Sequence, residues 1–137
     1  PVDIAVNDLE ITVCFKTGPF GGQLIDVLGG IDEAIAKAKE AGCNPMHVNM
    51  RFLKPLDSDA LENVCKKCST IITVEDGTLL GGLNSAVSEW VAANNYSVKV
   101  VPLGIPDKFI EHGSVPELYD ICGIDKQHVL NAIDKMI

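Results

Sequence analysis

The chain has 137 residues, of which 47% are hydrophobic, and this is enough for one compact domain with its own core. Acidic residues outnumber Lys and Arg by 19 to 11, and a formal net charge of -8 disfavours nucleic acid or an anionic membrane surface as a partner. The sequence has no apolar run of the roughly 20 residues that span a bilayer, and no basic start followed by a hydrophobic segment. We therefore expect a cytoplasmic protein. Because the chain begins Pro1-Val2 without Met, we also expect residues 1–137 to be a processed product or a single domain excised from a longer polypeptide.

The first half of the chain predicts a strand, a helical region and a second strand. Glu10–Gly18 is apolar and β-branched, as buried strands are. An apolar stripe at helical spacing then runs from Leu24 to Ala38 and ends at Gly42. Gly29-Gly30 interrupts this stripe, so either one helix tolerates the pair or two short helices share a face. Pro45–Leu53 is the second predicted strand.

A helix, a strand and another helix follow. Asp57 is the expected N-cap of a helix that buries Leu61 and Val64, and Ser69–Asp76 is the third strand. After the pair Gly81-Gly82, a further helix is predicted from an apolar stripe formed by Ala86, Val87, Trp90 and Val91.

The last quarter predicts a fourth strand and two helices. The strand is Tyr96–Gly104, and Ser114–Glu117 is a capping box with Pro in the first turn of a short helix that ends at Gly123. Asp125 then caps a final helix, whose apolar side is formed by Val129, Leu130, Ile133 and Ile137. The alternation of strands and helices predicts an open, mostly parallel α/β sheet with right-handed crossovers.

The five cysteines do not indicate a disulfide framework in a chain that can form a core. Cys65 and Cys68 have the CxxC spacing of redox and zinc sites, but no second pair is present and the motif falls at the end of a predicted helix. We interpret both as small apolar residues.

Ligands of open α/β sheets bind beyond the carboxyl ends of the strands. The glycine-rich segment Gly18–Gly22 lies there but matches neither a dinucleotide nor a P-loop motif. Gly81-Gly82 could offer backbone amides to an anion, although adjacent glycines at a helix start more often permit close packing. Arg51 and Lys54 follow the second strand.

Titratable side chains occupy two other strand ends. Glu75 and Asp76 could serve as a general acid and base, or could cap the following turn. His112 lies in the loop Ile105–Ser114, and histidine is a frequent acid–base catalyst. No partner for it is visible in the sequence, so we interpret it as a surface or interface residue. We interpret His47 and His128 as structural. The residues alone predict no catalytic, cofactor-binding or metal-binding side chain.

Three segments carry a resemblance to a known family: "MRFLKPLD" (50–57), "TVEDGTLLGGLNSAV" (73–87) and "LGIPDKFIEHGSVPELYDICGID" (103–125). In order and spacing they resemble the C-terminal domain of the 1-deoxy-D-xylulose-5-phosphate synthases, which are transketolase-like enzymes. The resemblance covers the chain from about Ile11 onward. It implies a three-layer α/β/α domain with a mostly parallel five-stranded sheet, whose antiparallel edge strand would come from Val2–Val6.

The resemblance also implies a role. The complete enzymes use thiamine diphosphate and Mg²⁺ to join pyruvate to glyceraldehyde 3-phosphate, a step of isoprenoid and thiamine biosynthesis, and two preceding domains hold these cofactors. This chain lacks the diphosphate motif of those domains, so we expect it to bind no cofactor and to be inactive alone. Its implied role is to pack on the preceding domains and to support a homodimer. The residues expected at those contacts are Arg51, Glu75, Gly81, Gly82, Asp107, Glu111 and His112.

Other interpretations remain open. The parent enzyme could be a transketolase or the β-subunit of a 2-oxoacid dehydrogenase. The chain could instead be a free-standing module that binds a small molecule, or a thiol redox protein that uses Cys65 and Cys68.

Overall fold

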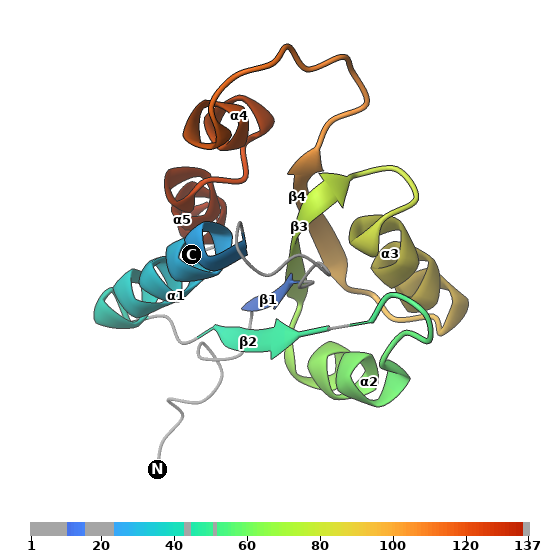
Figure 1. Cartoon of the computed structure of the whole chain (residues 1–137). Coiled ribbons are helices and arrows are strands. Elements are labelled where there is room, and N and C mark those ends of the chain that lie inside the picture. Colours follow the sequence, from blue (N-terminus) through green and yellow to red (C-terminus); the bar gives the residue numbers. More distant parts are fainter. Residues whose placement is uncertain (1–10, 16–23, 43–44, 51, 136–137) are drawn as a thin grey trace.

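A computed structural model of the chain describes residues 11–15, 24–42, 45–50 and 52–135, with side chains from Ile31 onward. Strands and helices alternate along the chain and then give way to two consecutive helices (Figure 1). The strands are β1 (Ile11–Phe15), β2 (Met46–Asn49), β3 (Thr70–Thr78) and β4 (Lys99–Ile105). The helices are α1 (Leu24–Glu40), α2 (Ser58–Lys67), α3 (Leu83–Ala93), α4 (Val115–Cys122) and α5 (Lys126–Asp134).

The four described strands form one sheet in the order β2-β1-β3-β4, and every neighbouring pair is parallel. Val13 of β1 lies in register with His47 on one side and Ile72 on the other. The predicted parallel α/β sheet is therefore confirmed for these strands. The antiparallel edge strand expected at Val2–Val6 lies outside the described residues.

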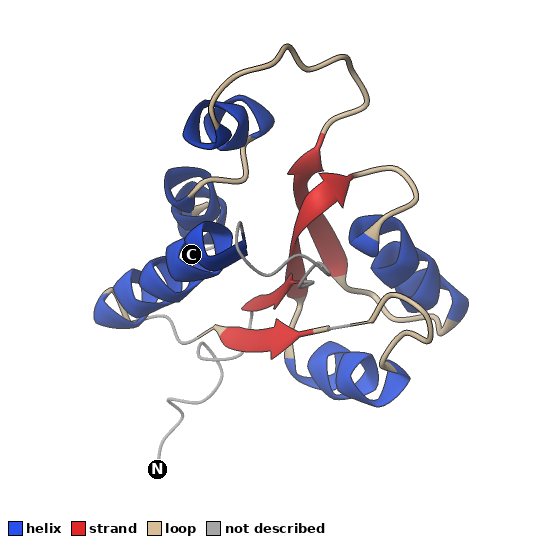
Figure 2. Cartoon of the chain, in the orientation of Figure 1, coloured by secondary structure: helices blue, strands red, loops and turns tan. Residues whose placement is uncertain are grey.

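Helices cover both faces of the sheet, so the domain has three layers (Figure 2). Side chains alternate along β3 because successive residues of a strand point to opposite faces. Ile72 and Val74 pack with α1 and α5, whereas Ile71 packs with α2 and α3. The two resulting cores explain why the strands read as nearly continuous apolar runs.

The first helix is continuous through Gly29-Gly30, so the alternative of one helix that tolerates the pair is confirmed. Its partner is α5: Ile31 and Ile35 of α1 are buried with Val129 and Ile133 of α5. An exposed ion pair between Lys126 Nζ and Glu33 Oε1, at 2.6 Å, joins the same two helices. Apolar burial on both helices offsets the low helix propensity of the glycines.

The strands differ from the predicted ranges mainly at their ends. The ladder of β2 is only Met46–Asn49, and β4 begins at Lys99 rather than Tyr96. Trp90 is half-buried, because its ring stacks on Tyr96 with centroids 5.7 Å apart and its indole N–H donates to Ser58 Oγ at 3.1 Å. Tyr96 therefore supports a helix instead of extending the sheet.

The predicted caps of α2 and α4 are present. The Asp57 carboxylate accepts a hydrogen bond from the Ala60 N–H at 2.9 Å. In the capping box of α4, Glu117 Oε2 accepts hydrogen bonds from the Ser114 hydroxyl at 2.6 Å and the Ser114 N–H at 2.9 Å. The hydroxyl and then the backbone bond lower the pKa of the Glu117 carboxyl. At the other end of α4, Gly123 has the left-handed φ of 71° that ends a helix.

In the part of the chain that the structure describes, no helix has the length and apolar character needed to span a membrane.

Candidate functional site

Glu75, near the end of β3, is a buried carboxylate that caps α3. It is 5% exposed. Its Oε2 accepts a hydrogen bond from the Leu83 N–H at 2.7 Å and its Oε1 accepts one from the Asn84 N–H at 3.1 Å. The first N–H groups of a helix have no internal partner and form the positive end of the helix dipole, so a carboxylate is stabilised there. The predicted capping role is confirmed for Glu75, and the engagement of both oxygens disfavours a role as general base.

Glycines make room for this carboxylate. A Cβ atom on Gly82 would lie 2.2 Å from Glu75 Oε2 and 2.4 Å from the carbonyl oxygen of Thr78. A Cβ on Gly104, in the neighbouring strand, would lie 3.0 Å from Glu75 Cγ. Gly81 has a φ of +81°, which favours glycine. Gly82 therefore permits close packing, whereas Gly81 permits the backbone conformation of the turn. The N-terminus of α3 holds the protein's own carboxylate in the place that a phosphate could take.

Hydrogen bonds close the turn between β3 and α3. The Gly81 N–H donates to Ser85 Oγ at 2.9 Å, and the Ser85 hydroxyl donates to the Leu79 carbonyl at 3.3 Å. The Leu79 N–H donates to the Ile105 carbonyl at 2.9 Å, which ties the turn to β4. Backbone and side chain together fix this segment against the sheet.

The loop between β4 and α4, residues 106–114, has a different character. In Figure 1 it arches from the end of β4 across to α4. The side chains of Asp107, Glu111 and His112 are exposed, and none of them makes a hydrogen bond or an ion pair with another described residue. Apart from the Ser114 cap, the loop's backbone contributes a bond from the Lys108 N–H to the Pro106 carbonyl at 2.8 Å.

A cavity of about 400 Å³ lies between this loop, α4 and the strand ends. Apolar side chains, including Ile105, Ile110 and Leu118, form most of its wall. Asp76 and Glu111 are the acidic residues in the lining, and the Tyr119 hydroxyl lies 3.5 Å from Asp76 Oδ2. The sequence offered no signal for this cavity, because its lining comes from segments that only the fold brings together.

Large exposed hydrophobic side chains follow three of the strands. They are Phe52 after β2 at 67% exposure, Leu80 after β3 at 62%, and Phe109 after β4, which is fully exposed. Because the strands are parallel, all three lie beyond the same edge of the sheet. The sequence pattern indicates no functional role for these residues, and it places Phe52 inside the predicted strand Pro45–Leu53, because an apolar residue beside a strand cannot be distinguished from a core residue by type alone. Exposed apolar side chains at one edge are typical of a surface that another chain segment or domain covers.

The predicted contact residues fall into two groups at this edge. Glu75, Gly81 and Gly82 belong to the β3–α3 turn, and their contacts are internal to the domain. Asp107, Glu111 and His112 belong to the β4–α4 loop and are exposed, and Glu111 and His112 also line the cavity. Since β3 and β4 are parallel neighbours, the fold brings both groups to one edge. Arg51 lies outside the described residues.

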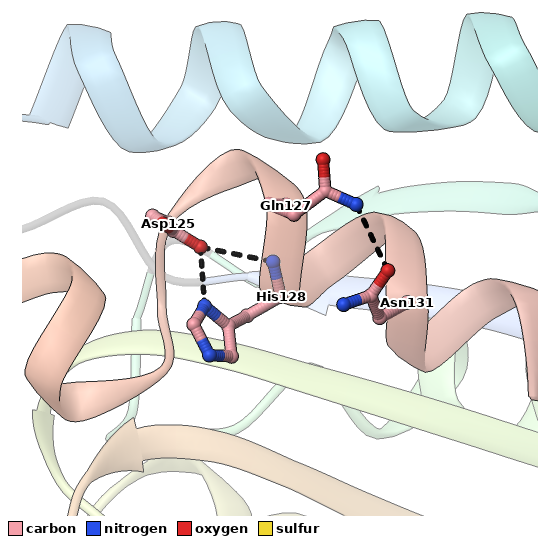
Figure 3. A network of polar contacts seen from close by, with 4 residues as sticks. All are labelled: Asp125, Gln127, His128 and Asn131. Atoms are coloured by element: carbon pink, nitrogen blue, oxygen red, sulfur yellow. Dashed lines mark hydrogen bonds and ion pairs between the residues drawn. The ribbon is translucent and has the colours of Figure 1, made fainter.

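Another polar cluster lies at the start of α5. One carboxylate oxygen each of Asp120 and Asp125 and one ring nitrogen of His128, which are atoms of the kind that can bind a metal ion, lie within 4.8 Å of one another. Figure 3 shows Asp125 Oδ1 bonded to His128 twice, with the backbone N–H at 2.9 Å and Nδ1 at 2.5 Å. Partial burial alone raises the pKa of Asp125, but these bonds outweigh it and lower that pKa. These two hydrogen bonds cap the N-terminus of α5 and explain why Asp125 and His128 lie together. This agrees with the structural role expected of His128.

The other titratable groups singled out by the sequence are structural too. Cys68 is buried and its thiol lies 3.8 Å from Met46 Sδ. Burial, with a smaller contribution from Cys68, raises the pKa of the Cys65 thiol, which is the opposite of what a redox thiol needs. His47 Nδ1 lies 3.4 Å from Asp32 Oδ1, and burial lowers the His47 pKa despite the opposing effect of that carboxylate.

Comparisons with known proteins agree with the fold. The 1-deoxy-D-xylulose-5-phosphate synthase of Cytophaga hutchinsonii is 48% identical over 93% of this chain, and that of Bacteroides thetaiotaomicron is 46% identical over 95%. The chain spans about a fifth of these relatives, 19% of each. A solved structure described as a split gene transketolase, inactive beta4 tetramer, matches 94% of this chain and 39% of its own, with a TM-score of 0.79 and 25% identity.

The family model described as the transketolase C-terminal domain matches residues 29–129, which include β2 to β4, most of α1, the β3–α3 turn and the β4–α4 loop. The chain belongs to the transketolase C-terminal domain family.

Proposed function

We propose that this chain is the C-terminal domain of a 1-deoxy-D-xylulose-5-phosphate synthase. The observation that carries the proposal is the identity of 48% over 93% of this chain with an enzyme of that name, of which the chain spans 19%. In this proposal residues 1–137 form a single domain of a longer, cytoplasmic enzyme, with a fifth, antiparallel strand completing the sheet. The complete enzyme joins pyruvate to glyceraldehyde 3-phosphate in isoprenoid and thiamine biosynthesis.

Thiamine diphosphate and Mg²⁺ bind to the preceding domains in this proposal. The described residues support that division. The helix N-terminus that follows β3, where a diphosphate could be held, already carries Glu75, and the Asp125–His128 pair is engaged in capping α5. We assign no cofactor contact and no catalytic step to this domain, and we expect it to be inactive alone.

The role that we propose for the domain is to pack on the preceding domains and to support a homodimer. Phe52, Leu80 and Phe109 project beyond the carboxyl edge, together with the polar side chains of Glu111 and His112. Apolar groups surrounded by polar ones are typical of an interface. Reactions on a cofactor need groups held within a fraction of an ångström, so rigid packing of a supporting domain contributes to the rate.

The test replaces Glu111 and His112 by Ala, one at a time, in the complete enzyme. We expect a weaker dimer in sedimentation or a raised KM, with the affinity for thiamine diphosphate retained. Glu89→Ala is the matched control, because Glu89 is an exposed carboxylate on α3, away from this edge. Loss of cofactor affinity with the dimer intact would contradict the proposed role.

The identity of the parent enzyme is tested separately. We expect the complete enzyme to form 1-deoxy-D-xylulose 5-phosphate from pyruvate and glyceraldehyde 3-phosphate. Transfer of a two-carbon unit between sugar phosphates instead would favour a transketolase, and oxidative decarboxylation of a 2-oxoacid would favour a dehydrogenase subunit.

A further inference from the structure

We propose that the cavity between the β4–α4 loop and α4 binds a small organic cation with an apolar body, such as a primary amine. This inference rests on the geometry of the described residues and does not depend on the proposed function.

The apolar wall sets the size and character of the ligand. The volume of about 400 Å³ is within the range of about 300 to 1,000 Å³ that is typical of small-molecule sites. Ile105 at the end of β4, Ile110 in the loop, and Val115 and Leu118 of α4 line it. A ring or a short branched chain placed there would remove its own apolar surface, and that of the wall, from water.

The acidic groups of the lining set the charge of the ligand. Asp76 near the end of β3 and Glu111 in the loop carry negative charge, and no Lys or Arg is among the lining residues that the structure describes. The Tyr119 hydroxyl beside Asp76 adds a further polar contact. The imidazole ring of His112 also lines the cavity. In a chain of net charge -8, a cation is attracted to this cavity and an anion is repelled.

The contacts of Glu75 and Asp76 place their side chains on different sides of β3. Both oxygens of the Glu75 carboxylate accept hydrogen bonds from the first N–H groups of α3. Asp76 lines the cavity, with Oδ2 3.5 Å from the Tyr119 hydroxyl of α4. The register between β3 and β4 shifts between Val74 and Thr78, so these contacts, and not regular alternation, fix the two directions. Glu75 is therefore a structural carboxylate, and Asp76 is exposed to a ligand.

This charge pattern separates the cavity from substrate binding. Pyruvate and glyceraldehyde 3-phosphate are both anions, so the substrates of the proposed enzyme are the wrong class for it. A ligand bound in this cavity would therefore not be a substrate of the proposed enzyme. It would bind at the same edge of the sheet at which we expect domains to pack.

The experiment compares three ligands of one shape: benzylamine, benzyl alcohol and benzoate. Binding to the 137-residue chain is followed by calorimetry and by backbone amide shifts. We expect benzylamine to bind with a Kd on the order of 1 mM, and to shift the amides of Ile105, Ile110 and Leu118. We expect benzyl alcohol to bind more weakly and benzoate not to bind.

Two carboxylate variants test the charge. Asp76→Asn should weaken benzylamine binding about two- to fivefold, as expected for one partly exposed charge contact, and should leave benzyl alcohol unaffected. Glu89→Gln, on α3, is the control that removes the same charge elsewhere and should change nothing. Asp76 is exposed, so the variant should fold, and unfolding by urea verifies this.

Other outcomes overturn the inference. Equal binding of all three compounds would show an apolar pocket without charge preference. Binding of benzylamine that Asp76→Asn does not change, or amide shifts at other parts of the sheet, would place the amine outside this cavity. None of these results bears on dimerisation, so the proposed function and this inference can fail independently.

Discussion

The β3–α3 turn and the β4–α4 loop leave the same edge of the sheet but use their polar residues in opposite ways. In the turn, the Glu75 carboxylate is 5% exposed and accepts two backbone hydrogen bonds. In the loop, Asp107, Glu111 and His112 are exposed and have no partner in the described part of the chain. Side chains whose hydrogen bonds are complete stabilise a fold, whereas exposed ones are available for recognition. Recognition of a ligand or of another domain at this edge should therefore be sought at the loop.

The largest expected effect is at the turn. We predict that Gly82→Ala lowers the free energy of unfolding by roughly 3 kcal/mol, because the new Cβ would meet a backbone carbonyl as well as Glu75. Urea unfolding measures the change. Gly113→Ala in the loop is the matched control, since its Cβ would approach nothing closer than 3.4 Å, and it should change stability little. Equal effects at both glycines would show that the contrast between the segments is wrong.

A smaller effect is expected from Glu75→Gln. The substitution keeps the size of the side chain but removes the charge at the helix terminus and turns one acceptor into a donor facing an N–H group. We predict a loss of roughly 1 to 2 kcal/mol in the free energy of unfolding. Asp76→Asn, the next residue, should change it by less than about 0.5 kcal/mol. Thermal unfolding of both variants gives the comparison, and a neutral Glu75→Gln would argue against the capping role.

A pH dependence is expected at the end of the loop, where Glu117 caps α4. Hydrogen bonds from Ser114 lower the Glu117 pKa in the folded state, so the stabilisation is fully present above the pKa of a free glutamate, about 4.3, and is lost as pH falls through the lower folded value. We predict that the protection of the amides in the first turn of α4, measured as the exchange rate relative to the intrinsic rate at the same pH, falls below about pH 4. Ser114→Ala should remove most of this dependence, and protection that stays unchanged in acid would contradict it.

The smallest effect on stability is expected from Phe109→Ser. The side chain is fully exposed and removes no apolar surface from water within this domain, so the free energy of unfolding should change by less than about 0.5 kcal/mol. In the complete enzyme, the same substitution should weaken assembly. Sedimentation at several concentrations measures this, and an unchanged assembly would mean that Phe109 lies outside any contact.

Sequence patterns predicted most of the fold because burial on both faces leaves a strong signal. The four strands, the Asp57 and Asp125 caps and the capping box at Ser114 were all predicted correctly. Strand ends were less accurate, as at Tyr96, because a stacking contact with Trp90 is a tertiary event. The β3–α3 turn was partly predictable, since a buried acid and a glycine pair are informative together. The cavity was not, because Asp76, Ile110 and Leu118 share no local pattern.

The close approach of Gly82 to Glu75 has a consequence for how related sequences can diverge. The two positions occupy a single volume, so a side chain cannot be gained at one without a shorter residue at the other. Homologous proteins that keep glutamate at the first position should therefore keep glycine at the second. A shorter first residue removes only part of the obstacle, because the Thr78 carbonyl oxygen would still lie 2.4 Å from the new Cβ. Aligned sequences should therefore show glycine at the second position even where the acid is lost.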